Sequence, residues 1–251
     1  MFRAVRFDVG DTLLYYANTP LDWSSHYSGA LSAVASACRM APDPQQLAAG
    51  RDILRHYNTR VRPRVDEVTA EEVFSRILSA WSLPIDYLDV AVDAFFVFFQ
   101  QGMCAFPETL SVLRTLRASG LRIGALTDVP YGMPPRFVER DLERAHLAEL
   151  LETVVTSAMV GRRKPAPDGF VALAASVGVA SHEMLYVGNE PKDIIGAKRA
   201  GVPAALIDRS GGAPEHGQSY TVSSLTALLE ICTPRSNQAM ERTADRPTPR
   251  F

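Results

Sequence analysis

The residues best suited to chemistry in this 251-residue sequence lie in four short polar segments. These are Asp8-Val9-Gly10-Asp11-Thr12, Thr127-Asp128, Arg163-Lys164-Pro165, and Gly188-Asn189-Glu190 with Asp193 shortly after. A carboxylate can act as a nucleophile and divide one difficult displacement into two easier ones. Taken singly, however, each of these residues is more typical of a turn, a helix cap or a solvated surface.

The elements around these segments follow an alternating pattern. Short apolar runs predict strands at 3–8, 121–126, 153–156, 184–187 and 204–207, and helical patterns lie between them at 108–119, 136–151, 167–177 and 192–200. Strands that alternate with helices predict an α/β fold with a parallel, doubly wound sheet. Ligands bind beyond the carboxyl ends of such strands, so we expect the polar segments to meet there.

The first strand is followed by a long stretch without strand patterns. Between residues 18 and 102 we expect four helices, at 21–40, 44–57, 70–81 and 85–101. Four amphipathic helices can bury a core of their own. We therefore predict an α/β core domain at 1–17 and 103–232 and an inserted helical domain at 18–102. The remaining residues, 233–251, are rich in Arg, Pro and Thr and are expected to form a disordered tail.

Together and in this order, the four polar segments resemble the motifs of the haloacid dehalogenase (HAD) superfamily. The resemblance covers roughly residues 3–209, and the insertion matches the helical cap of class-one members (subfamily IA-like) in position. It implies a Rossmann-like parallel sheet with an inserted four-helix cap domain. It also implies a hydrolase.

The resemblance assigns roles to individual residues. Asp8 would be the nucleophile, Thr127 would donate a hydrogen bond to the phosphoryl group, and Lys164 would stabilise both Asp8 and the transition state. Mg²⁺ would be the cofactor, because it prefers oxygen ligands and offsets repulsion between the carboxylate and the phosphoryl oxygens. Its expected ligands are Asp8, the carbonyl of Gly10, Asn189, Glu190 and Asp193.

The sequence departs from the family pattern at two positions. Most phosphatases of the family carry a second Asp, the general acid and base, where this chain has Gly10. Asp11 is acidic but one residue further on, and in extended backbone it would point to the opposite face. Asn189 replaces the first metal-binding Asp of the fourth motif and supplies no charge. We expect Asp11 to take the catalytic role, with Glu190 as the alternative, and Glu190 or Asp193 to supply the missing charge.

Three functions are compatible with these departures. The favoured one is a Mg²⁺-dependent phosphatase acting on a small phosphorylated metabolite through an aspartyl-phosphate on Asp8. The second is a 2-haloacid dehalogenase, which uses the same nucleophile without a metal. The third is a catalytically weak member that binds a ligand or a protein partner. A phosphonatase mechanism is disfavoured, because it needs a cap lysine and the insertion contains none.

Candidate substrate-binding residues lie in the insertion and beside the motifs. Arg60, Arg62 and Arg64 surround Pro63 and would suit a carboxylate or a second phosphate, although a solvated basic loop is equally typical of this pattern. Asp128, Tyr16 and Tyr131 are the further candidates for lining the pocket.

The composition of the chain limits the classes of binding partner that we expect. The formal net charge of −2 gives no basic field for nucleic acid. No apolar run reaches the ~20 residues that a membrane helix requires, so no membrane association is expected. The three cysteines, Cys38, Cys104 and Cys232, follow no metal-binding spacing and indicate a reduced, cytoplasmic environment. We expect a monomer or homodimer.

Overall fold

The computed structural model describes residues 1–17, 19–212 and 214–233. Its centre is a six-stranded sheet in the order β5-β4-β1-β6-β7-β8, in which every neighbouring pair is parallel. The strands are β1 (Ala4–Phe7), β4 (Arg122–Thr127), β5 (Thr153–Thr156), β6 (Met184–Gly188), β7 (Ala204–Ile207) and β8 (Tyr220–Val222). The predicted α/β class and parallel sheet are confirmed, while β8 was not predicted.

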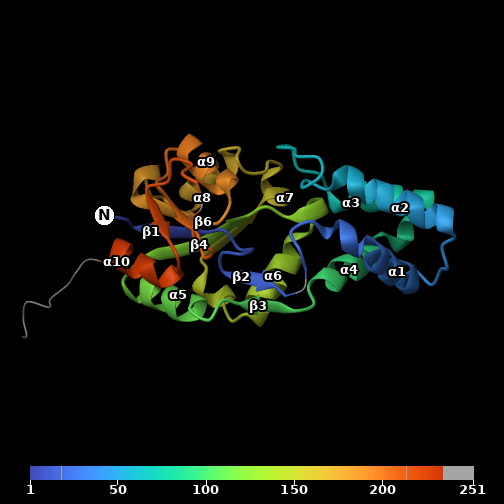
Figure 1. The fold of residues 1–251 in the computed structure, drawn as a ribbon, viewed down its shortest axis with the longest axis horizontal. Helices are drawn as coiled ribbons and strands as arrows, with labels where there is room; N and C mark the ends of the chain where they lie inside the picture. The colour runs from blue at the N-terminus through green and yellow to red at the C-terminus, as the bar shows by residue number, and fades with distance from the viewer. Residues whose placement is uncertain (18, 213, 234–251) are drawn as a thin grey trace, which may run out of the picture.

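Helices cover both faces of this sheet (Figure 1). On one face lie α8 (Asp168–Val177) and α9 (Pro191–Arg199), and on the other lie α5 (Thr109–Ala118) and α10 (Leu228–Cys232). Alternate residues of β1 belong to different cores: Val5 and Phe7 pack with the α5 side, and Ala4 packs with the α8 and α9 side. Burial on both faces explains why the strands are nearly continuous apolar runs.

Four further helices lie together at one end of the molecule (Figure 1). They are α1 (Tyr27–Ala37), α2 (Pro44–Tyr57), α3 (Ala70–Ala80) and α4 (Leu88–Phe99), and we call them the inserted helices. Asp43 and Gln46 form a reciprocal capping box at the start of α2, and the Thr69 side chain accepts from Glu72 N at the start of α3. The first helix begins later than predicted, because residues Trp23–His26 form a 3-10 turn.

A small antiparallel pair joins the inserted helices to the sheet region. It consists of β2 (Leu14–Tyr16) and β3 (Met103–Ala105), which flank the inserted helices in the chain. Three-residue strands are too short to leave a periodic pattern, so the sequence did not predict this pair.

The predicted helix at 136–151 is also wrong in extent. Helix α6 (Pro135–Arg144) ends early, and His146 takes a positive φ of 57° before a 3-10 turn at Ala148–Leu150. Short helix α7 (Ser157–Val160) was not predicted. No helix of the described ranges is both long and apolar enough to cross a bilayer. The predicted tail lies outside the described residues except for Thr233.

Candidate active site

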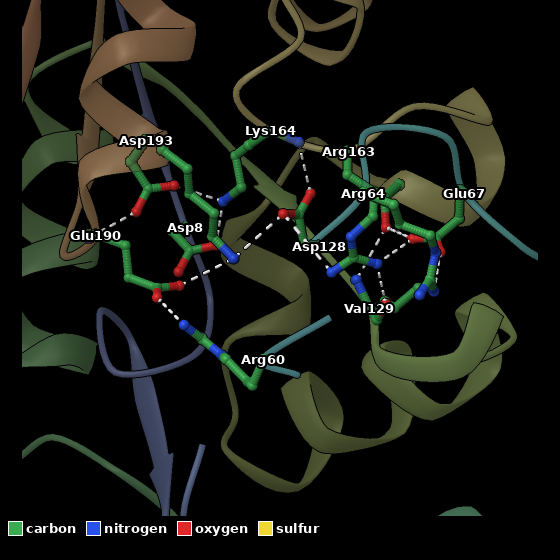
Figure 2. A network of polar contacts seen from close by, with 12 residues as sticks. Asp8, Arg60, Arg64, Glu67, Asp128, Val129, Arg163, Lys164, Glu190 and Asp193 are labelled. Carbon is green, nitrogen blue, oxygen red and sulfur yellow. Dashed lines mark hydrogen bonds and ion pairs between the residues drawn. The ribbon is translucent and has the colours of Figure 1, made fainter. Parts of the chain in front are cut away.

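Asp8 lies directly after β1 at the carboxyl edge of the sheet and is 6% exposed. Its Oδ1 atom is 2.6 Å from Nζ of Lys164, and the same ammonium group is 2.6 Å from Oδ1 of Asp193 (Figure 2). All three side chains are at most 8% exposed. The structure therefore brings Asp8 and Asp193 together around the buried ammonium group of Lys164, although Asp8 and Lys164 are 156 positions apart in the sequence.

Tyr186 on β6 completes the surroundings of Lys164, although it was not among the candidate residues. Lys164 Nζ donates to the Tyr186 hydroxyl at 3.1 Å, and that hydroxyl donates to the Leu126 carbonyl at 2.8 Å. The tyrosine also packs edge-on against Phe170, with 4.7 Å between ring centroids. The sequence alone does not distinguish this contact with Lys164 from simple core packing, because a tyrosine is common in a buried strand.

The charges of this group perturb one another. Burial raises the pKa of Asp8, and the neighbouring Asp193 raises it further, while the ion pair with Lys164 opposes the rise. Burial alone would lower the pKa of Lys164, but the two carboxylates, Asp193 and Asp8, hold it well above its usual value. Two carboxylates thus share one ammonium group, which leaves this end of the site short of positive charge.

The segment after Asp8 turns rather than extends. Asp11 has a φ of 56°, and its N–H donates to the Leu14 carbonyl at 2.7 Å. The expectation that Asp11 would point away assumed extended backbone, whereas this turn lets Asp11 line the same cavity as Asp8 and Gly10. Burial and the nearby Glu190 raise the pKa of Asp11.

The second motif splits into two roles. Thr127 is 7% exposed and lines the cavity beside Asp8. Asp128 accepts from the backbone N–H of Lys164 at 3.0 Å and forms ion pairs with Lys192 at 3.2 Å and Arg163 at 3.8 Å. Burial would raise the pKa of Asp128, but these cations, led by Lys164, lower it. Asp128 therefore holds the motifs together at the floor of the cavity.

The fourth motif is committed largely to internal contacts. Asp193 Oδ2 accepts from the backbone N–H of Glu190 at 2.9 Å. Glu190 pairs with Arg60 at 2.5 Å and with Lys192 at 2.9 Å, and these cations outweigh burial to lower its pKa to about 2. The Asn189 amide oxygen accepts from the Thr12 hydroxyl at 3.2 Å.

These contacts test how well the site fits Mg²⁺. Within the described ranges, no three His, Cys, Asp or Glu side chains are grouped so that they could hold a metal ion. Of the predicted ligands, Asp8, Gly10, Asn189 and Glu190 line the cavity, whereas Asp193 does not. Glu190 is already paired with Arg60 and Lys192, which leaves Asp8 as the charged oxygen donor among them. Oxygen donors suit Mg²⁺, which commonly uses one or two carboxylates and keeps several waters. The surplus carboxylate charge around Lys164 also suits a cation, so the residues fit Mg²⁺ with one charged ligand.

The cavity above Asp8 has a volume of about 160 Å³ and is bounded by both the sheet edge and the inserted segment. Tyr16 and Tyr131 line it, but their hydroxyl groups are engaged with Asp141 at 2.6 Å and Tyr27 at 2.7 Å, so they offer mainly their rings. Gly132, next to Tyr131, allows this segment to lie close to the backbone of Val68, because a Cβ atom at position 132 would lie 2.3 Å from the Val68 carbonyl oxygen.

The three candidate arginines separate in space. Arg60 reaches the cavity and pairs with Glu190. Arg64 instead donates to the Tyr57 carbonyl at 2.5 Å and pairs with Glu67 at 3.4 Å. Arg62 contacts His56 at 2.7 Å in an exposed position and does not line this cavity.

Hydrogen bonds and an ion pair connect the loop that carries these arginines to the third motif and the residues before it. Glu67 N donates to the Gly161 carbonyl at 2.9 Å, and Arg163 N donates to the Val65 carbonyl at 2.7 Å. The Glu67 carboxylate accepts from Arg163 and from the Ser157 hydroxyl (Figure 2). Glu67 was not among the candidate residues, since an acidic residue in a loop is usually solvated.

A parallel sheet with a buried aspartate and lysine at its carboxyl edge, facing an inserted helical segment, defines a class of α/β hydrolase. The family model of haloacid dehalogenase-like hydrolases matches residues 2–201, and this chain belongs to that family.

Individual relatives show partial similarity. The chain is 32% identical over 146 residues to "Phosphatase MT3486" of Mycobacterium tuberculosis, a match that covers 58% of this chain and 64% of that protein. It is 38% identical over 106 residues to phosphoglycolate phosphatase of Rhodospirillum rubrum, covering 42% of each chain. The matches thus span less than two thirds of either relative.

Solved structures share the fold at lower identity. A HAD phosphatase from Thermococcus onnurineus superposes with a TM-score of 0.64 at 21% identity and covers 92% of this chain and 97% of its own. A 2-haloacid dehalogenase from Pseudomonas syringae superposes with a TM-score of 0.65 at 22% identity, covering 92% and 98%. Because phosphatases and dehalogenases match equally well, the fold does not choose between them.

Proposed function

We propose that this protein is a Mg²⁺-dependent phosphatase that hydrolyses a small phosphorylated metabolite through an aspartyl-phosphate on Asp8. The observation that carries the proposal is the buried contact of 2.6 Å between Lys164 and Asp8, which itself lines a cavity of about 160 Å³. The relatives named as phosphatases support the same reaction class.

Charge balance supports the need for a metal. Five basic and five acidic side chains form one network around the cavity: Arg60, Arg64, Arg163, Lys164 and Lys192 with Asp8, Glu67, Asp128, Glu190 and Asp193. A phosphoryl group adds negative charge, and this balanced network has no surplus positive charge to offset it. Mg²⁺ held by Asp8, the Gly10 carbonyl and Asn189 would supply that charge and polarise the phosphoryl oxygens.

In the first step, a carboxylate oxygen of Asp8 forms a bond to phosphorus as the bond to the leaving alcohol oxygen breaks. Lys164 favours the ionised form of Asp8 and orients it, and Thr127 donates its hydroxyl hydrogen bond to a phosphoryl oxygen. In the second step, water attacks the same phosphorus, the bond to Asp8 breaks, and inorganic phosphate leaves.

Asp11 is the proposed proton carrier. Protonated, it donates its proton to the leaving alcohol oxygen, and ionised, it accepts a proton from the attacking water. Its turn conformation places it in the wall of the same cavity as Asp8. The inserted helices act as a cap, and Arg60, Tyr16 and Tyr131 line the side of the leaving group.

One alternative activity has a specific observation in its favour. The site offers one carboxylate and an amide where a metal would bind, and aromatic residues Tyr16, Trp23 and Tyr131 form part of the cavity wall. These features suit metal-independent displacement of a halide from a 2-haloacid by Asp8.

The experiment that tests the proposal measures phosphate release from a panel of phosphorylated metabolites and an aryl phosphate. It compares the protein with Mg²⁺, with EDTA, and with Asp8→Asn. We expect release that requires Mg²⁺ and disappears in Asp8→Asn. Calorimetry of Mg²⁺ binding gives a readout independent of turnover, and Asp8→Asn should weaken it. Halide release from 2-haloacids in EDTA would replace the proposal by the alternative.

A further inference from the structure

A second cavity lies beside the first, between the loop at 59–65 and the third and fourth motifs. Its volume is about 290 Å³, several times the ~30 Å³ share of a water molecule in the liquid. Thr59, Arg60, Asp128, Arg163 and Lys192 line both cavities, whereas Asp8 and Thr127 line only the first. The two spaces are therefore neighbours that share a wall.

The lining of the second cavity is strongly basic. Its charged residues comprise five cations and, among the described residues that line it, the single acid Asp128; the cations are Arg60, Arg64, Arg163, Lys164 and Lys192. The carboxylates that pair with Arg64 and Arg60, which belong to Glu67 and Glu190, are not among its lining residues. The space itself therefore lies on the cationic side of these pairs.

Two of these cations are held in a water-poor environment. Arg163 and Lys164 have side chains that are 5% and 2% exposed. The charge of a cation with little access to water is screened less, so an oxyanion in the cavity beside it would be attracted more strongly than at an exposed site.

We propose that the second cavity is an oxyanion subsite that binds the distal anionic group of the substrate. Arg64 and Lys192 are its principal ligands, and Arg163 contributes positive charge from behind. The substrate class is then a phosphomonoester whose alcohol part carries a carboxylate or a second phosphate. This inference rests on the proposed function, since it takes the phosphoryl group to be at Asp8.

Arg62 provides a matched control within the same loop. It lies two residues from Arg64, contacts His56 and lines neither cavity. Replacing Arg62 or Arg64 by Met removes the same charge from the protein. Only the change at Arg64 removes a donor from the second cavity.

The test measures binding of non-hydrolysable phosphonates by calorimetry in the presence of Mg²⁺. It compares 3-phosphonopropionate and 4-phosphonobutyrate with propylphosphonate and butylphosphonate, which match them in length but lack the carboxylate. We expect the carboxylated member of at least one pair to bind about tenfold or more tightly, as a charged hydrogen bond predicts. Arg64→Met should erase that preference, and Arg62→Met should keep it. Lys192→Met is the second variant, in case Arg64→Met does not fold.

Equal affinities within both pairs would overturn the subsite, as would equal losses in Arg62→Met and Arg64→Met. Binding of inorganic phosphate to protein already saturated with propylphosphonate, lost in Arg64→Met, would also overturn it, because the cavity would then take a separate anion. The result is distinguishable from failure of the proposed function. A carboxylate preference without any phosphate release would leave the subsite standing and remove the phosphatase.

Discussion

The two ends of the polar network differ in the sign of their unbalanced charge. At the Asp8 end, two carboxylates, Asp8 and Asp193, share the ammonium group of Lys164. At the other end, one carboxylate, Glu67, lies between the guanidinium groups of Arg64 and Arg163 (Figure 2). The first arrangement favours an added cation and the second an added anion, as the proposed metal and the proposed anionic substrate require.

The largest effect should come from removing the cation Lys164 at the Asp8 end of the network, which we call the acidic end; the Glu67 end is the basic end. Lys164→Met leaves two buried carboxylates without their shared counter-charge, and breaking a buried pair in this way costs about 3–5 kcal/mol. We expect this loss of unfolding free energy in denaturant titrations, together with a loss of catalysis of at least ~10²-fold. Lys192→Met is the control for stability, because the Lys192 side chain is 27% exposed. Equal destabilisation by both variants would contradict the difference in burial.

The next effect concerns the proton carrier beside the acidic end. Asp11→Asn should lower kcat for alkyl phosphates by ~10²–10⁴-fold and for aryl phosphates much less, because a good leaving group needs little protonation. Asparagine also tolerates the positive φ of this position, so the turn should persist. Gly10→Asp in the same background should restore part of the rate, since a Cβ there meets nothing within 4 Å. Equal losses for alkyl and aryl esters would remove Asp11 from the acid role.

At the basic end the expected effect is on stability. Glu67→Gln keeps the shape of the side chain but leaves Arg64 and Arg163 without their shared counter-charge. We expect a loss of about 1.5–3 kcal/mol, the usual worth of hydrogen bonds to charged groups. Asp66→Asn is the matched control, because its side chain is 82% exposed and pairs with half-exposed Arg162; exposed pairs contribute about 0–1 kcal/mol. Thermal and denaturant unfolding of both variants check the contrast, and similar losses would show that Glu67 is not special.

The sequence predicted the acidic end better than the basic end, and the reason is physical. Asp8 and Thr127 lie at the ends of strong apolar runs, so the parallel sheet brings them to one edge, and Lys164 was predicted from its place in the third motif. Glu67 and Arg64 lie in a loop whose position depends on backbone contacts with Gly161 and Arg163, far along the chain. Local composition carries no information about such contacts, and the same residues in another fold would be solvated.

Buried charge within strands was equally beyond sequence reasoning. Arg6 on β1 is fully buried, with guanidinium nitrogens that have no hydrogen-bond partner, and burial lowers its pKa to about 10. Asp11 was expected in extended backbone, whereas a local hydrogen bond to Leu14 turns the chain there. Strand and helix positions follow from periodicity, but a single-residue turn leaves no periodic signal and polar partners depend on tertiary contacts.

The smallest expected effect tests how much the Tyr186 hydroxyl contributes to holding Lys164 in place. Tyr186→Phe removes one neutral hydroxyl that accepts from Lys164 and donates to Leu126, but it leaves both carboxylates and the ring contact with Phe170 in place. We expect a loss of about 1 kcal/mol in unfolding free energy, and a modest decrease in kcat with KM unchanged. Kinetics on an alkyl phosphate with denaturant titration would measure both. If Tyr186→Phe instead matched Lys164→Met in either readout, the lysine would be positioned mainly by the hydroxyl group, and the argument from two carboxylates sharing one cation would fail.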